Sequence, residues 1–266
     1  MEIIEHKPNE NLNHIIDSYY LIETTVTTDD SIPPLGHPVI QFHLKNDLDT
    51  FFSNYDFPIE AVFIIGQLSK FAKITRIEHS KIIGVNLKPT ALHKLTNINM
   101  ALLTDKGAPA SYYFNHDIYS LLTDIKQSND TNSIIHLLDN YFMKLIENKP
   151  IKQDKFDHLI TRIIETKGNI TIEEIERICP MSIRTRQRYF TERIGLSMKT
   201  YLRVIRNLSL FKLLNEHPNK PISELIFAVG YYDYSHFNKD FKLMTGMTPQ
   251  QYFSTNQLFT KELLSI

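Results

Sequence analysis

Apolar and polar positions alternate in the first third of the chain in the way that β-strands require. In residues 37–44, HPVIQFHL, apolar and polar side chains follow one another with a period of two. The short apolar runs AVFIIG at 61–66 and KIIGVNL at 81–87 predict two further strands, and prolines separate these segments. We therefore expect residues 1 to about 100 to form a small mixed β-sheet or partial barrel.

Further along the chain the spacing of apolar residues becomes that of α-helices. KPTALHKL at 88–95 begins this pattern, with Pro89 at a first helical position, where its missing N–H has no partner to lose. In IIHLLDNYFMKLI at 134–146 apolar residues recur at steps of three and four, which predicts an amphipathic helix. FDHLITRIIETKGN at 156–169 follows the same pattern and ends at a glycine and an asparagine, a common helix C-terminus.

The polar stretch ENKPIKQDK at 147–155 is the expected linker between two domains. It separates an N-terminal domain at 1–146 from a helical domain at 156–255, and a tail at 256–266 follows. A chain of 266 residues is long enough for two such domains. The expected fold class is α+β, with a small mixed sheet or partial barrel and its helices followed by an all-α domain.

Two pairs of short helices occur in the helical domain, each pair separated by a tight turn. In the later pair, ISELIFAV at 222–229 and YSHFNKDFKLMTG at 234–246 flank Gly230, which can adopt the positive φ of a helix end. Asp233 is placed to cap the second helix. The expected inner face of that helix carries Phe237, Phe241 and Met244. The outer face carries side chains that can reach bases or phosphates: Ser235, Asn238, Lys239 and Lys242.

The same arrangement occurs earlier in the chain. A capping box, TIEE at 171–174, opens the helix IEEIERI, and the turn CPM leads to SIRTRQRYFTERIG at 182–195. Ser182 is the expected N-cap of that second helix and Gly195 its terminator. Its expected inner face carries Ile183, Phe190 and Ile194, and its outer face Arg184, Thr185, Gln187 and Arg188. Two such units held about 34 Å apart could enter successive major-groove turns of DNA, although a generic helical hairpin has the same pattern.

The distribution of charge favours a polyanionic partner for the helical half. The net charge of the chain is -1, but residues 151–266 hold 17 basic and 12 acidic residues, so the first 150 residues are acidic. Residues 182–212 alone hold eight basic residues and one acid. A single cysteine, Cys179, excludes a disulfide scaffold and a multi-cysteine zinc site.

The second unit carries a recognisable signature. The stretch PISELIFAVGYYDYSHFNKDFKLMTGMTPQQY at 221–252 closely resembles that of AraC/XylS-family transcription regulators. That signature combines I-x-E-I, A-x-x-x-G-(F/Y), D-x-S-(H/Y)-F, a following F-K, and G-x-(S/T)-P before an aromatic residue. SIRTRQRYFTERIGLSMKTYLRVIRN at 182–207 is similar to the first unit and connecting helix of the family. The resemblance covers about residues 155–255.

The resemblance implies a sequence-specific DNA-binding transcription regulator that inserts two recognition helices into successive major-groove turns of promoter DNA. By position, the base-reading residues fall on Arg184, Gln187 and Arg188 in the first unit and on Tyr234, Ser235, Asn238 and Lys239 in the second. Arginine suits guanine, and glutamine and asparagine suit adenine. Lys242, Arg203 and Arg206 are the expected phosphate or packing residues.

The chain departs from the family pattern at four positions. Glu176 stands where the family has a small residue, Pro180 where it has the turn glycine, Arg186 where it has a core leucine, and Ile226 where it has alanine. A charged side chain at 186 must extend its guanidinium outward or find a partner, and we expect it to add a phosphate contact. Whether the first unit reads bases is left open by these departures.

The N-terminal segments resemble a truncated cupin-like barrel that senses a small molecule or dimerises in AraC-type regulators. The partners implied are promoter DNA and RNA polymerase, with a homodimer and an effector as further expectations; activation is the working expectation for the sign of regulation. We expect no cofactor and no metal, because His37, His43, His79 and His93 lack paired ligand spacing. A cupin-like metal-dependent enzyme and a helix-turn-helix-derived protein-interaction module are the alternatives. No signal peptide or membrane span is visible, so a cytoplasmic protein is expected. The resemblance to transcription regulators implies a protein without enzymatic activity.

Overall fold

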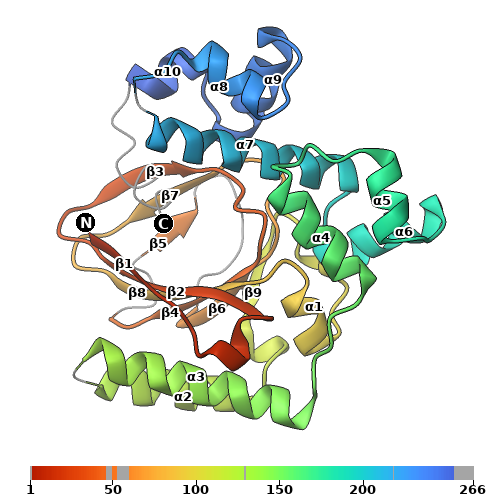
Figure 1. Cartoon of the computed structure of the whole chain (residues 1–266). Coiled ribbons are helices and arrows are strands. Elements are labelled where there is room, and N and C mark those ends of the chain that lie inside the picture. The colour runs from red at the N-terminus through yellow and green to blue at the C-terminus, as the bar shows by residue number, and fades with distance from the viewer. Residues whose placement is uncertain (1, 46–49, 53–59, 129, 218, 255–266) are drawn as a thin grey trace.

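The computed structural model describes residues 2–45, 50–52, 60–128, 130–217 and 219–254. It places a β-sheet domain between two groups of helices (Figure 1). The predicted α+β class is confirmed. The strands are β1 (Glu2–His6), β2 (Ile16–Glu23), β3 (Thr28–Ile32), β4 (Val39–His43), β5 (Thr50–Phe52), β6 (Val62–Ile65), β7 (Ala72–Arg76), β8 (Lys81–Leu87) and β9 (Gly107–Pro109).

The strands form two sheets. One has six strands in the order β1-β2-β8-β4-β6-β9, and the other has three in the order β3-β7-β5. Every pairing between the described strands is antiparallel, so the expected mixed sheet is instead an antiparallel one. The three segments predicted as strands from their apolar pattern coincide with β4, β6 and β8.

Both faces of β4 are covered, which explains why its alternating sequence is buried throughout. Ile40 and Phe42 pack into the core shared with the helices α2 (Asp117–Gln127) and α3 (Thr131–Asn148). Val39 packs into a second core between the two sheets, where the amide of Gln41 donates a 2.8 Å hydrogen bond to the hydroxyl of Tyr20. The polar positions of the pattern therefore face the interior of the barrel rather than solvent.

The short helices of the sheet domain are α1 (Ala91–Thr96) and the 3₁₀ turns η1 (Glu10–Leu12), η2 (Met100–Leu103) and η3 (Ala110–Tyr112). The helix expected near residue 88 thus starts at Ala91, and Pro89 lies before it rather than at its first position. α3 extends to Asn148 and the next helix begins at Lys155, which leaves a short polar connection inside the expected linker. The expected tail at 256–266 lies outside the described residues.

The C-terminal half is helical, as predicted. It comprises α4 (Lys155–Glu165), α5 (Ile172–Ile178), α6 (Ile183–Tyr189), the π-helical turn η4 (Phe190–Ile194), α7 (Met198–Glu216), α8 (Ile222–Ala228), α9 (Tyr234–Thr245) and α10 (Pro249–Ser254). α7 crosses the sheet domain and joins the group α4–α6 to the group α8–α10 (Figure 1). Each group has its own apolar core, and both cores include residues of α7.

Candidate nucleic-acid interface

The second helix pair is built around the turn at Gly230. Gly230 has a φ of +82°, and the carboxylate of Asp233 accepts a 2.7 Å hydrogen bond from the backbone N–H of His236. The turn and the N-cap are therefore as predicted. The expected inner face of α9 is also confirmed, because the side chains of Phe237, Phe241 and Met244 are fully buried.

Tyr231 links this turn to α7. Its ring is buried, and its hydroxyl accepts a 2.8 Å hydrogen bond from the side-chain amide of Asn207. The guanidinium of Arg206 lies 5.4 Å from the centre of the same ring and donates to the carbonyl of Gly168 at 3.2 Å. Arg206 thus holds the turn after α4 against the turn before α9. Of the two roles expected for Arg206, packing is the one that this geometry supports.

The outer face of α9 presents polar and aromatic side chains to solvent. Ser235, Lys239 and Lys242 are exposed, Tyr234 is 47% exposed and Asn238 is partly buried. The ring of Tyr234 packs edge-on against Phe237 at 5.5 Å, which orients it without burying it. All five lie on one helix, so the structure brings together the residues expected to read DNA in this unit.

One exposed aromatic residue beside this face was missed in the sequence. Tyr232, in the turn that leads to α9, is 89% exposed. A single residue in a turn gives no periodic signal that distinguishes buried from exposed positions. The preceding residue, Tyr231, is also a tyrosine, yet it is buried. The difference between them depends on which way the turn directs each side chain.

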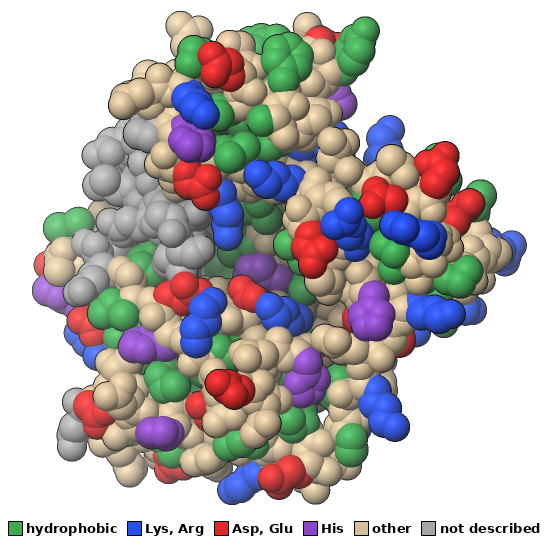
Figure 2. Space-filling model, in the orientation of Figure 1, with side chains coloured by type: hydrophobic (Ala, Val, Ile, Leu, Met, Phe, Trp, Pro, Cys, Tyr) green, Lys and Arg blue, Asp and Glu red, His purple; other side chains and the backbone are tan. Residues whose placement is uncertain are grey.

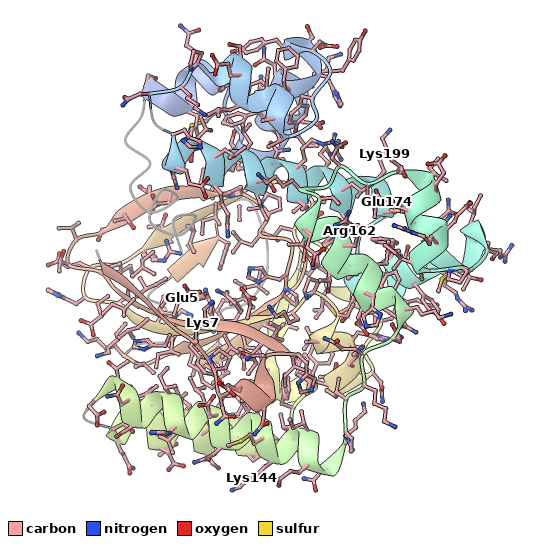
Figure 3. The ribbon with its side chains drawn as sticks, viewed as in Figure 1. Glu5, Lys7, Lys144, Arg162, Glu174 and Lys199 are labelled. Atoms are coloured by element: carbon pink, nitrogen blue, oxygen red, sulfur yellow. The ribbon has the colours of Figure 1, made fainter. Side chains whose placement is uncertain are left out.

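The first helix pair is capped at each expected position. The hydroxyl of Thr171 and the carboxylate of Glu174 complete a capping box at the start of α5, and Ser182 accepts a 3.1 Å hydrogen bond from the N–H of Thr185. Arg162 on α4 and Glu174 on α5 point toward each other and form a 3.0 Å ion pair (Figure 3). This partly exposed pair links α4 to the first turn of α5.

The outer face of α6 is exposed as predicted, at Arg184, Gln187 and Arg188. Arg188 also lies 3.8 Å from Glu192 one turn later, a surface pair that leaves its guanidinium accessible. In the space-filling view, basic and acidic side chains are interspersed over the helices α4–α6 (Figure 2). The cationic character of the first unit is therefore local to α6 rather than spread over the whole lobe.

Two expectations about α6 need correction. Ile183 was expected on the inner face but is 64% exposed, and Arg186 was expected to reach outward but is 5% exposed. The buried row consists of positions 186, 190 and 194, which are spaced by four, and Ile183 at the first helical position lies outside it. Arg186 occupies the core side of the helix, and this conformation offers no phosphate contact from its guanidinium.

The other departures from the family pattern are accommodated without strain on the core. Glu176 and Pro180 are exposed, and Ile226 is buried in the core of the second unit. Arg203, expected to contact phosphate or to pack, lies 3.5 Å from the carboxylate of Asp240 on α9. It therefore connects α7 to the second recognition helix.

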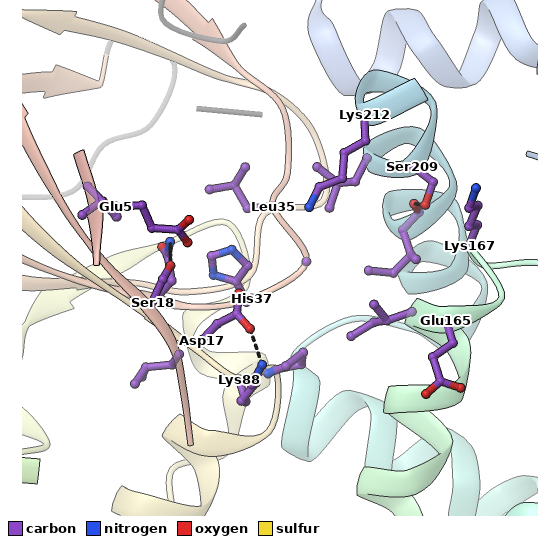
Figure 4. Close-up of a pocket in the computed structure, with 18 of the residues that line it drawn as sticks. Glu5, Asp17, Ser18, Leu35, His37, Lys88, Glu165, Lys167, Ser209 and Lys212 are labelled. Atoms are coloured by element: carbon purple, nitrogen blue, oxygen red, sulfur yellow. Dashed lines mark hydrogen bonds and ion pairs between the residues drawn. The ribbon is translucent and has the colours of Figure 1, made fainter. Parts of the chain in front are cut away.

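A cavity of about 410 Å³ lies between the sheet domain and the helical domain. A hollow between the barrel and the helices above it is visible on the molecular surface (Figure 2), and Figure 4 shows residues from both domains around the cavity. Leu35 and Leu208 contribute apolar surface. The titratable lining residues are Glu5, Asp17, His37 and Lys88 from the sheet domain and Glu165, Lys167, Lys212 and Glu216 from the helices.

Two titratable groups in this cavity have shifted pKa values. Burial alone would raise the pKa of Asp17, but the hydrogen bond and the charge of Lys88 outweigh it, so that the pKa is lowered (Figure 4). Burial lowers the pKa of His37, against the opposing effect of the Asp17 charge. Near neutral pH the cavity therefore holds an ionised Asp17–Lys88 pair and a neutral imidazole.

Two negative findings concern the part of the chain that the structure describes. Within these residues no group of three or more His, Cys, Asp or Glu side chains is arranged to hold a metal ion. No helix among them is long and apolar enough to cross a membrane.

Comparison with known proteins agrees with the helical architecture. Residues 177–255 match a family described as "Helix-turn-helix domain", and residues 4–109 match a "Domain of unknown function (DUF6597)". The chain is 26% identical over 153 residues to an "Uncharacterized HTH-type transcriptional regulator" of Haemophilus influenzae, which covers 52% of this chain and 51% of that protein. It is 26% identical over 138 residues to the "HTH-type transcriptional regulator MtrA" of Neisseria gonorrhoeae, with 46% of each chain covered. The chain thus spans about half the length of the curated relatives it matches, and both of these are described as transcriptional regulators.

A solved structure resembles nearly the whole chain in fold. It is that of a lysine-to-alanine variant of apo ToxT from Vibrio cholerae, with a TM-score of 0.51 at 12% sequence identity. The match covers 94% of this chain and 99% of that one. At this identity the likeness concerns the fold alone.

Proposed function

We propose that the chain is an AraC-type helix-turn-helix protein that regulates transcription by binding promoter DNA with α6 and α9 in successive major-groove turns. The observation that carries this proposal is the pair of capped recognition helices whose outer faces are exposed and whose inner faces are buried against α7. Such helices present side chains to base edges while a rigid core fixes their pose.

The proposed base contacts differ between the two units. In the first unit they come from Arg184, Gln187 and Arg188, all of which are exposed. In the second they come from Tyr234, Ser235, Asn238 and Lys239, with Lys242 on a phosphate. Arg186 is left out of the proposed contacts because its side chain is buried.

The remaining parts of the proposal concern the N-terminal domain and the protein partners. A cavity bounded by both domains supports modulation by a small molecule, because a ligand held there interacts differently with each relative placement of the domains. Contact with RNA polymerase and assembly into a homodimer are proposed by analogy with AraC-type regulators. Transcriptional activation follows from the same analogy.

The test is a titration of the 266-residue chain against the duplex upstream of its own coding region at several salt concentrations. If side chains such as Lys242 contact phosphates, the logarithm of the binding constant falls linearly with the logarithm of salt, by about 0.9 per phosphate contacted. Lys242→Ala should reduce the slope by about one. Lys144→Ala is the matched control, since Lys144 lies on α3, on the other side of the sheet domain from α7 (Figure 3). Absence of duplex binding, or binding that salt does not weaken, would refute the proposal.

A further inference from the structure

The C-terminal ends of both recognition helices contact the sheet domain. η4, which continues α6, ends at Gly195 with a φ of +90°, and the carbonyl of Gly195 accepts a hydrogen bond from the hydroxyl of Thr104. A Cβ on Gly195 would lie 2.8 Å from the carbonyl oxygen of Met100. The backbone of η2 thus packs directly on the end of the first recognition helix, with no room for a side chain between them.

The second recognition helix ends in the same way at another part of the sheet domain. α9 ends at Gly246, with a φ of +76°. The hydroxyl of Ser31 on β3 donates a 2.7 Å hydrogen bond to the carbonyl of Thr245, and the N–H of Phe71 lies 3.4 Å from the carbonyl of Leu243. A Cβ on Gly246 would lie 2.6 Å from the ring of Phe71. Again a glycine allows close contact with the N-terminal domain.

A third contact lies between these two, on the connecting helix. Gly36, in the loop before β4, has a φ of +76° and packs against α7. A Cβ there would lie 2.9 Å from the side chain of Ile205 and 3.5 Å from that of Leu208. The sheet domain therefore contacts the end of one recognition helix, the middle of the connecting helix and the end of the other recognition helix.

These contacts leave the proposed DNA-reading faces uncovered. The sheet domain contacts the C-terminal ends at Gly195 and Gly246, whereas Arg184, Gln187 and Tyr234 lie toward the helix beginnings and remain exposed. Their effect is on the separation of the two units, which are also connected by α7 and by its side chains Arg203 and Arg206. A protein that reads two half-sites distinguishes their spacing to the extent that its two recognition helices are held rigidly.

We propose that Thr104 and Ser31 are positioning residues that hold the two recognition helices at one separation, so that the sheet domain sets the half-site spacing that the chain accepts. The effect on half-site spacing rests on the proposed function, because it requires that the chain binds DNA with both helices. The structural premise, that the sheet domain fixes the distance between the units, does not depend on DNA.

The structural premise is tested by measuring the distance between the two units in the free protein. Spin labels are attached at Glu173→Cys on α5 and Glu224→Cys on α8, both exposed, while the native Cys179 is buried. We expect a narrow distance distribution that broadens in Thr104→Val and is restored in Thr104→Ser, which keeps the hydroxyl. Thr123→Val is the matched control, because the Thr123 hydroxyl also donates to a carbonyl, that of Tyr119, within α2. An unchanged distribution in Thr104→Val would overturn the proposal.

The consequence on DNA is tested with duplexes that carry both half-sites at the preferred spacing or with one or two base pairs inserted. For Thr104→Val we expect affinity at the preferred spacing to fall about 2- to 10-fold, as for the loss of one hydrogen bond, with a smaller change at the other spacings. Affinity for a single half-site should not change. Ser31→Ala, which removes the contact to the end of α9, should likewise make the affinity depend less on the half-site spacing. If the dependence of affinity on half-site spacing were unchanged in these variants, the proposal would be overturned. Failure of the wild-type chain to bind any duplex would instead refute the proposed function.

Discussion

Replacement of Gly230 by alanine tests how the turn positions the second recognition helix. Gly230 has a φ of +82°, and an L-residue with a Cβ pays about 1–2 kcal/mol to adopt that conformation. The added methyl would also lie 3.0 Å from the side-chain carbonyl carbon of Asn169, which is tighter than usual. Because Asn169 is exposed, its side chain can rotate away, so the backbone conformation should account for most of the cost.

We therefore expect Gly230→Ala to lower the free energy of unfolding by about 1–2 kcal/mol in urea denaturation. Gly230→Asn should cost less, since asparagine tolerates positive φ better than alanine. A double-mutant cycle with Asn169→Ala separates the two contributions, and we expect a coupling below about 0.5 kcal/mol. The reasoning would be refuted if removal of the Asn169 side chain restored full stability, because contact rather than backbone conformation would then be the cause.

Three further predictions concern single side chains. Arg184→Ala and Asn238→Ala should each reduce the preference for cognate over random duplex by about 1–3 kcal/mol, and equal losses on both duplexes would contradict their role in base reading. Asp233→Ala should lower the free energy of unfolding by about 1 kcal/mol through loss of the α9 N-cap, and an unchanged value would show that the cap contributes nothing. Burial lowers the pKa of His37, so the unfolded chain takes up its proton first as the pH falls below about 6.5. Stability contributed by the neutral imidazole is then lost between about pH 6.5 and the lower folded pKa, and His37→Gln should show a smaller loss in urea denaturation between pH 7.5 and 5.5 than the wild type. An equal loss in both proteins would contradict the shift.

The second unit was predictable because its signals are local. A glycine at the turn, an aspartate at the N-cap and apolar residues at steps of four and three on α9 each have one structural explanation, and these explanations agree. Tyr231 stands at the aromatic position of the family pattern, and its ring is buried. The partly buried state of Asn238, in contrast, depends on how α9 packs and has no signal in the sequence.

The first unit was predicted less well because its inner face is not purely apolar. Arg186 is buried in a row with Phe190 and Ile194, and the exposed Ile183 has the apolar character that the pattern assigns to a core position. Hydrophobic periodicity cannot identify a buried arginine, because it weighs residue type and not neighbours. The π-helical turn that ends this helix has no signal in hydrophobic periodicity either.

The contacts between domains were not accessible from the sequence. Thr104 and Gly195 are 91 positions apart, and Ser31 and Thr245 are 214 apart. Threonine is common in loops and glycine is common at helix ends, so each residue is explained by its local position. Nothing in the local sequence therefore indicates that these residues contact the other domain. The cavity around His37 could not be predicted from the sequence for the same reason, since its lining residues come from strands and helices that are distant in sequence.

Selection of bound duplexes from a random pool tests the central claim most directly. With two recognition helices at work, the wild-type chain should enrich two sequence elements whose centres lie about 10–10.5 base pairs apart. Arg184→Ala should erase one element and Asn238→Ala the other. Enrichment of a single element, of none, or loss of the same element in both variants would contradict the account that α6 and α9 each read their own turn of the major groove.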